Sequence, residues 1–227
     1  RLVFLSSVAA YGYHAGNPVP LTEDVPARGS PEHYYSAHKA ACEALLAEAT
    51  AGTTTRAYVL RPCIVAGPDA TTLIRSLQWR PVTEKIPAPA RWLLARAPGL
   101  RPFVPDPGMP VQLVHQDDVA SAVLAAAVTG SGPPGAYNLA AAGQVTIADL
   151  ARAAGDCTFP VPHLLAVAGS RLAGTLPWTP PEFEWIHAVR YPMLMDASRA
   201  YRDLGWVPRY TAHEALATMD PRNVARA

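Results

Sequence analysis

Lysine is scarce in this chain of 227 residues, because only two of its nineteen basic residues are Lys and the other seventeen are Arg. Charged residues make up 16% of the sequence and the formal net charge is +1. This balance argues against a nucleic-acid-binding surface and against disorder. We find no apolar stretch long enough to cross a bilayer and no signal peptide. We therefore expect a cytoplasmic protein of one or two globular domains, with no nucleic-acid or membrane partner.

Cysteine is scarce as well, with only Cys42, Cys63 and Cys157, and their spacing fits neither a metal site nor a redox pair. An odd number of thiols is typical of the reducing cytoplasm. A catalytic role for Cys63 is one hypothesis, but we favour a cysteine packed in the core. We predict no metal site.

One of the two lysines stands four residues after a tyrosine, as Tyr35 and Lys39. Residues 35–48 are rich in Ala, Leu and Glu and contain neither Gly nor Pro, so they predict a helix. Residues four apart share a face of a helix, so the phenol and the ammonium can point to one small volume. A nearby cation favours the phenolate, which makes Tyr35 a candidate acid/base. A solvated surface pair is the alternative.

An apolar run at the start of the chain is followed by two hydroxyl residues, Ser6 and Ser7. Short apolar runs of this kind are typical of buried parallel strands. The two serines should then lie at the carboxyl end of the strand, where ligands bind in open α/β sheets.

Five stretches, each weak alone, together resemble the extended short-chain dehydrogenases/reductases, the NAD-dependent epimerase/dehydratase family. They are Ser-Ser-Val-Ala-Ala-Tyr-Gly (6–12), Tyr-x-x-x-Lys (35–39), Leu-Arg-Pro-Cys-Ile-Val-Ala-Gly-Pro (60–68), Val-His-Gln-Asp-Asp-Val-Ala (114–120), and a tail stretch (196–208) that begins with Asp-Ala-Ser-Arg-Ala and ends with Leu-Gly-Trp-Val-Pro. The resemblance implies an α/β fold, specifically the part of a doubly wound, Rossmann-like parallel sheet from strand 4 onward, with a small substrate-binding subdomain.

The same resemblance implies site residues. Ser7 matches the hydroxyl that binds the substrate oxygen, Tyr35 the proton donor or acceptor, and Lys39 the residue that holds the nicotinamide ribose. Pro62, Cys63 and Ile64 match the segment beside the nicotinamide ring, so NAD or NADP is the expected cofactor. The resemblance also allows a homodimer.

For the domains, we expect residues 1–67 and 111–145 to form the remaining half of the Rossmann-like domain. Residues 68–110 and 146–227 would form the substrate-binding subdomain, with a possible helix at 91–97. Three tryptophans could line a substrate pocket, although core packing is the interpretation we favour for each: Trp178, Trp185 and Trp206.

The family's Gly-rich turn, which binds the cofactor pyrophosphate, has no counterpart here. The stretch from Gly130 to Gly135 has the right glycine spacing, but it follows a helical run and precedes a strand, which reverses the required order. We therefore expect a truncated form of a longer enzyme, one that binds NAD(P) poorly by itself.

Several positions bear on the substrate. Family dehydratases carry an Asp and a Glu where this chain has Val8 and Ala9, so water elimination is not expected. Family epimerases acting on UDP-sugars carry an Asn and an Arg where this chain has Ile64 and Val111. The leading prediction is therefore an NAD(P)-dependent oxidoreductase that acts on a carbonyl or alcohol of a small, fairly apolar substrate. A nucleotide-sugar epimerase and a non-catalytic binding protein are the alternatives.

His115, Asp117 and Asp118 resemble a ligand cluster, but we favour helix-capping and structural roles, with Asp117 as the cap. Residues 146–149 and the capping box at 211–214 predict the starts of two further helices. His33 and His38 flank Tyr35, and surface positions explain both.

Overall fold

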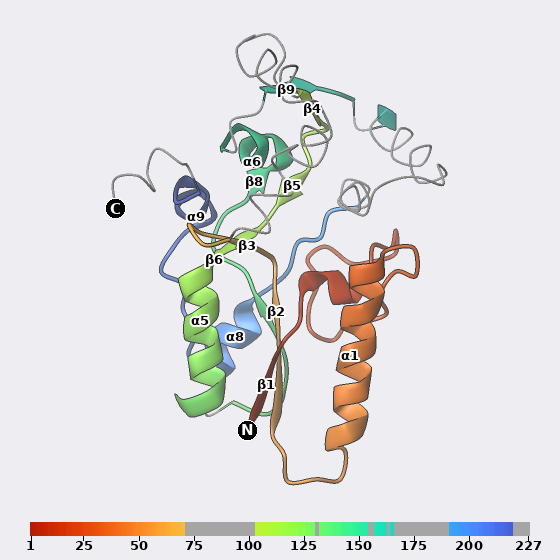
Figure 1. The fold of residues 1–227 in the computed structure, drawn as a ribbon, viewed down its shortest axis with the longest axis vertical. Helices are drawn as coiled ribbons and strands as arrows, with labels where there is room; N and C mark the ends of the chain where they lie inside the picture. The colour runs from red at the N-terminus through yellow and green to blue at the C-terminus, as the bar shows by residue number, and fades with distance from the viewer. Residues whose placement is uncertain (71–102, 130–131, 154–156, 163, 166–190, 220–227) are drawn as a thin grey trace, which may run out of the picture.

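The computed structural model describes residues 1–70, 103–129, 132–153, 157–162, 164–165 and 191–219 (Figure 1). Its centre is a parallel three-stranded sheet in the order β1-β2-β7, made of β1 (Leu2–Leu5), β2 (Ala57–Pro62) and β7 (Gly135–Leu139). Leu60 of β2 is in register with Leu5 on one side and Tyr137 on the other. The predicted α/β class with a parallel, Rossmann-like sheet is confirmed.

Helices cover both faces of this sheet (Figure 1). The 17-residue helix α1 (Tyr34–Thr50) lies on one side, and α5 (Gln116–Leu124) and α8 (Ser198–Leu204) lie on the other. The predicted helix at 35–48 is thus confirmed, with one residue more at its start and two more at its end. It stops before Gly52, whose φ of +67° is a backbone conformation that glycine adopts without strain.

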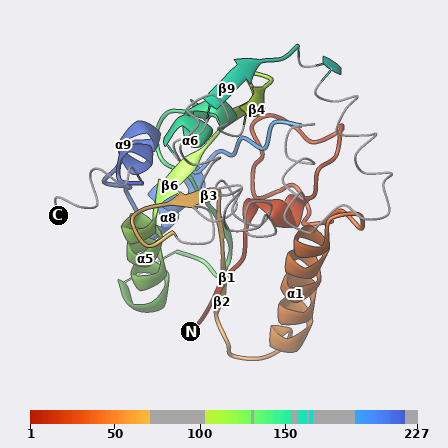
Figure 2. The same cartoon turned by 45° about the horizontal axis from the view of Figure 1, so that its top comes forward.

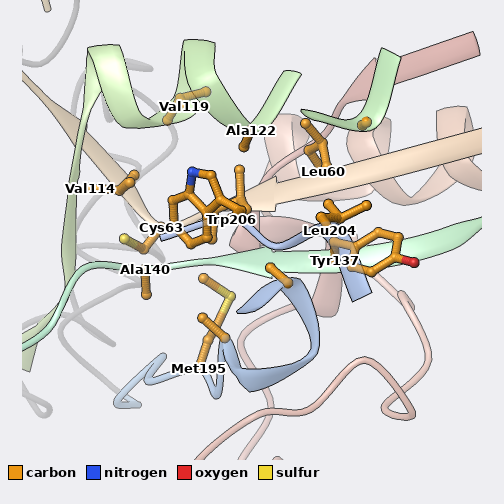
Figure 3. Close-up of a cluster of buried hydrophobic side chains, with 14 of the residues drawn as sticks. Leu60, Cys63, Val114, Val119, Ala122, Tyr137, Ala140, Met195, Leu204 and Trp206 are labelled. Carbon is orange, nitrogen blue, oxygen red and sulfur yellow. The ribbon is translucent and has the colours of Figure 1, made fainter. Parts of the chain in front are cut away.

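The main core lies between the sheet, α5 and α8, and Trp206 is at its centre (Figure 3). The indole is 2% exposed and donates from Nε1 to the carbonyl oxygen of Asp118 over 2.9 Å. Burying the ring with its N–H paired is the favourable way to place a tryptophan in a core. The core packing favoured for Trp206 is therefore confirmed, and Trp178 and Trp185 lie outside the described residues.

Among the described residues, the remaining strands form three small pairs, and two short helices accompany them. The pairs are β3 (Ile64–Ala66) with β6 (Leu113–His115), β4 (Phe103–Asp106) with β9 (Cys157–Pro160), and β5 (Pro110–Val111) with β8 (Val145–Thr146). The helices are α6 (Ile147–Ala153) and α9 (Ala212–Ala217). Figure 2 shows β4, β9 and α6 together at one end of the molecule, and Figure 1 shows that end beyond the carboxyl ends of β1 and β2.

Helix starts agree with the sequence in two cases and differ in one. The capping box of Thr211 and Glu214 is present at α9, and Thr146 and Asp149 exchange hydrogen bonds at the start of α6. At α5 the predicted cap was wrong, because His115 and not Asp117 caps the helix. The Nδ1 atom of His115 accepts from the Asp117 amide over 3.2 Å.

The carboxylate of Asp118 is fully buried and accepts the amide protons of Arg209 and Tyr210 at 2.9 and 3.2 Å. It thereby fastens the segment after α8 to α5, so the structural role favoured for Asp118 is confirmed. The predicted helix at 91–97 lies outside the described residues. Within the ranges that the structure describes, no helix combines the length and the apolar character that a membrane span requires.

Candidate active site

The carboxyl ends of β1 and β2 lie side by side, and Ser6 and Ser7 follow β1 directly. The Ser6 amide donates to the Leu60 carbonyl oxygen over 2.8 Å, which extends the pairing of the two strands by one residue. Ser7 comes next, half-buried, where β1 turns into the short 3-10 helix η1 (Val8–Tyr11). The expectation that both serines lie at the carboxyl end of a parallel strand is therefore met.

Helix α1 brings Tyr35 and Lys39 to this same strand end. The Lys39 Nζ atom lies 5.6 Å from the centroid of the Tyr35 ring, within the range of a cation–π contact. The same Nζ donates to the carbonyl oxygen of Leu5, the last residue of β1, over 2.8 Å. The Tyr35 side chain is 45% exposed. The phenol therefore faces solvent, while the ammonium beside it is anchored to the strand.

Ser7 has a local hydrogen bond of its own. Its Oγ accepts from the Ala9 amide over 3.2 Å and caps η1. Among the residues that the structure describes, no hydrogen bond joins Ser7 to Tyr35. Ser7 lies two residues beyond Leu5, whose carbonyl Lys39 contacts. Ser7 and the Tyr35–Lys39 pair are therefore near the same end of β1.

The segment expected beside the nicotinamide ring connects β2 to β3. Pro62 is buried at the end of β2, and the Cys63 amide donates to the Leu139 carbonyl oxygen of β7 over 2.9 Å. Cys63 faces the main core (Figure 3), where burial raises the pKa of its thiol. A thiol in this environment stays protonated and is a poor nucleophile. The core position favoured for Cys63 is confirmed. Ile64 is half-buried and packs on a second apolar cluster formed around Leu113.

A buried ion pair that was not predicted from the sequence joins α1 to β2. The Glu43 carboxylate, one turn beyond Lys39 on α1, accepts three hydrogen bonds from the Arg61 guanidinium of β2 at 2.6, 3.1 and 3.2 Å. It also accepts from Ser6 Oγ over 2.5 Å. Both charged side chains are less than 10% exposed, at 9% for Glu43 and 7% for Arg61. We refer to these three residues as the Ser6–Glu43–Arg61 network.

The network continues through Tyr11 to the far strand of the sheet. The Arg61 guanidinium carbon lies 4.5 Å from the centroid of the Tyr11 ring. The Tyr11 hydroxyl donates to Asn138 Oδ1 of β7 over 2.8 Å. Burial raises the pKa of this phenol, although the Arg61 charge opposes the shift. Tyr11 is thus held neutral as a hydrogen-bond donor inside the fold.

The two histidines beside Tyr35 differ from one another. His38 is exposed, and its ring lies tilted against the Tyr34 ring with 3.9 Å between ring centroids. His33 is buried, so the surface position expected for it was wrong. Its Nδ1 accepts from the Ser36 amide over 3.1 Å and caps α1, a role usually taken by a smaller polar residue. The described part of the chain contains no group of three or more His, Cys, Asp or Glu side chains arranged to hold a metal.

These features define a Rossmann-like α/β protein with a hydroxyl, a phenol and an ammonium at the carboxyl end of a parallel sheet. Residues 1–140 match the model of the NAD dependent epimerase/dehydratase family, and the chain belongs to this family. The resemblance carried by the five sequence stretches is confirmed.

The chain is also similar to individual proteins. An uncharacterized protein of Mycobacterium tuberculosis and one of Mycobacterium bovis are each 30% identical over 106 residues, covering 47% of this chain and 28% of theirs. Among solved structures, a UDP-galactose 4-epimerase matches with a TM-score of 0.62 and 21% identity, over 99% of this chain and 63% of that one. MoeE5 in complex with UDP-glucuronic acid and NAD gives 0.62 and 22%, over 99% and 64%. RMD from Pseudomonas aeruginosa complexed with NADPH gives 0.61 and 19%, over 99% and 67%.

The chain therefore spans less than a third of the length of the curated relatives and about two thirds of these solved chains.

Proposed function

We propose that the protein is an NAD(P)-dependent oxidoreductase that transfers hydride to or from a carbonyl or alcohol carbon of a small, fairly apolar substrate. The observation that carries this proposal is the position of Lys39. Its ammonium lies beside the Tyr35 ring and on the Leu5 carbonyl, two residues before Ser7. An acid/base tyrosine, a cation and a hydroxyl at one strand end are the groups that carbonyl reduction needs.

We propose that the residues at this strand end hold a dinucleotide. An ammonium has three protons and the Leu5 carbonyl takes one, so Lys39 keeps donors for the hydroxyls of a ribose. Pro62, Cys63 and Ile64 join β2 to β3, and we propose that this segment lies beside the nicotinamide ring. When bound, the cofactor would supply or accept the hydride.

The chain's own side chains would manage the oxygen of the substrate. In the reducing direction, Tyr35 would donate its phenolic proton to the oxygen that becomes the alcohol, and Ser7 would donate a hydrogen bond to the same oxygen. The Lys39 ammonium would stabilise the negative charge that develops on the Tyr35 oxygen as its proton leaves. In the oxidising direction each proton movement is reversed.

The residues after Ser7 argue against water elimination. Val8 is half-buried and Ala9 is buried, and neither can act as an acid or base. The leading proposal is therefore a reductase or dehydrogenase rather than a dehydratase. Apolar side chains at the start of η1 also agree with a fairly apolar substrate.

A nucleotide-sugar epimerase is the second candidate. The solved structures of similar fold include a UDP-galactose 4-epimerase and MoeE5 bound to UDP-glucuronic acid. Such a reaction would use the same Ser7, Tyr35 and Lys39, with hydride leaving and returning. Ile64 and Val111 do not supply the polar contacts that a diphosphate needs, so the reductase remains our first proposal.

The domain division belongs to the proposal as well. Residues 1–67 and 111–145 would carry the cofactor half, and 68–110 and 146–227 the substrate half, with α8 returning to cover β7. We propose a cytoplasmic protein that acts on a small molecule, with a homodimer as its possible assembly.

The test uses protein expressed from the complete reading frame. Aldehydes, ketones and secondary alcohols of increasing apolar character are supplied with NADH, NADPH or their oxidised forms, and the absorbance of reduced nicotinamide is followed. UDP-sugars are assayed in parallel by chromatography. Net cofactor oxidation or reduction supports the oxidoreductase, and sugar interconversion without net cofactor change supports the epimerase. If neither assay shows turnover, whether or not the cofactor binds, a non-catalytic protein is favoured.

A further inference from the structure

We infer that Ser6, Glu43 and Arg61 form a positioning network that sets the separation between Ser7 and the Tyr35–Lys39 pair. This inference rests on the proposed function, because it assigns a role to residues around the same site. The three residues are not placed in contact with substrate or cofactor.

The first step is the spacing along α1. Tyr35, Lys39 and Glu43 follow one another at intervals of four residues, so they lie on one face of the helix. Lys39 contacts the carbonyl of Leu5 and Glu43 contacts the hydroxyl of Ser6. Two successive turns of the helix thus hold two successive residues of the strand end. The next residue along the strand is Ser7.

The second step is the anchoring of Glu43 itself. A buried carboxylate is stable only when its charge is compensated and its oxygens are hydrogen-bonded. Arg61 provides both through two nitrogens, Nε and Nη2, from β2. A guanidinium fork and a carboxylate fit in one relative orientation, so the pair fixes the rotation of α1 about its axis as well as its distance from the sheet. A single-point contact would leave the helix free to turn.

The third step compares the network with the other contacts of α1. Ser36 Oγ, in the first turn, donates to the Ala9 carbonyl of η1 over 2.6 Å and holds the segment after Ser7. Contacts therefore secure the chain on both sides of Ser7, at Ser6 and at Ala9. Ser7 itself needs no direct bond to Tyr35 in order to keep a constant place relative to it.

The consequence for turnover follows from geometry. A small displacement of a reacting group lowers the rate steeply, whereas binding of the ligand changes much less. We expect Ser6→Ala and Glu43→Gln to lower kcat by about ten- to hundredfold. We expect KM to change by no more than about threefold, because neither residue is placed against a ligand.

The control is Tyr58→Phe. Tyr58 is fully buried on the same strand as Arg61, three residues earlier, and donates to the Gly132 carbonyl over 3.1 Å. Its substitution removes one buried hydrogen bond, as Ser6→Ala does, but at a distance from Ser7. If stability alone governed turnover, Tyr58→Phe and Ser6→Ala would lower kcat alike.

A second measurement does not depend on activity. A 3-fluorotyrosine placed at position 35 reports its surroundings through its fluorine resonance, recorded for the wild-type chain and each variant. We expect the resonance to shift or broaden in Ser6→Ala and Glu43→Gln and to stay unchanged in Tyr58→Phe. An unchanged resonance in both network variants would overturn the inference, as would a loss of kcat no larger than that of the control. If the wild-type protein shows no turnover but the resonance shifts in Ser6→Ala and Glu43→Gln, the network is upheld and the proposed function is rejected.

Discussion

The Lys39 ammonium donates a hydrogen bond to the carbonyl oxygen of Leu5, and this contact ties the second turn of the candidate catalytic helix to the end of a strand 34 residues earlier. It fixes the cation while leaving the neighbouring Tyr35 phenol exposed. A fixed cation beside an accessible phenol suits proton transfer, because the charge does not have to reorganise as the proton moves.

Tyr35→Phe should therefore abolish most turnover. Loss of a general acid/base typically lowers the rate by about 10²- to 10⁴-fold, and we expect kcat to fall within that range. Tyr34→Phe is the matched control, since Tyr34 precedes it on the same helix and is 65% exposed. Turnover of the two variants is measured with whichever substrate the wild-type protein accepts. Equal effects of both substitutions would contradict the assignment of Tyr35.

Lys39→Arg should also lower turnover although it preserves the charge. The Lys39 Nζ reaches Leu5 O as a compact donor, and it lies 5.2 and 5.6 Å from the ring centroids of Phe4 and Tyr35. A planar guanidinium is larger and presents its donors in a fixed fork, so it cannot reproduce this contact. We expect at least a tenfold loss of kcat/KM, about 1.4 kcal/mol. Arg28→Lys, at an exposed arginine, controls for the exchange itself and should leave the rate unchanged.

How far the sequence predicts this site depends on the range of the interaction. The face shared by Tyr35 and Lys39 follows from helix periodicity alone, and that prediction is confirmed. Glu43 continues the same spacing, so the signal was present in the sequence. Its partner was not predictable in this way, because Arg61 meets Glu43 only through the packing of α1 on β2. Sequence spacing within one element does not determine which strand residue a helix will face.

Helix caps are local contacts, yet the sequence predicts them only in part. The box at Thr211 and Glu214 uses residues that usually cap helices, and it was predicted correctly. The caps of α1 and α5 are His33 and His115, whose rings accept an amide proton as a carboxylate or hydroxyl would. Histidine is uncommon at this position, so residue preferences pointed to Asp117 instead.

Removing one partner of the buried Glu43–Arg61 pair should cost more stability than removing both. Arg61→Met leaves the Glu43 carboxylate buried without its cation, which typically costs about 3–5 kcal/mol. In the double variant Arg61→Met, Glu43→Leu no charge remains, and we expect a smaller loss than in the single variant. Urea unfolding followed by circular dichroism gives both values. A double variant less stable than Arg61→Met would show that the two charges are not coupled.

Asp149 should contribute stability that depends on pH. The Thr146 amide and hydroxyl, followed by Arg152, lower the pKa of this carboxyl below its usual 3.8. A lowered folded-state pKa contributes stability that is present at neutral pH and is lost as the pH falls through that pKa. Asp149→Asn should therefore be less stable than wild type at pH 7, and the difference should shrink in acid below the carboxyl's ordinary range. Melting temperatures across this pH range test it, and a constant difference would contradict the assignment.

The two thiols described should differ in reactivity. Cys42 is exposed on α1, whereas Cys63 is buried in the main core, where the pKa of its thiol is raised by burial. Since the thiolate is the reactive form, a water-soluble aromatic disulfide should label Cys42 quickly in the native protein and Cys63 only after unfolding. The experiment uses a Cys157→Ser background, and Cys42→Ser in that background should abolish the fast phase. Cys63→Ala should retain turnover if its side chain serves only packing. A loss of activity in a variant that still folds would restore the hypothesis of a catalytic Cys63.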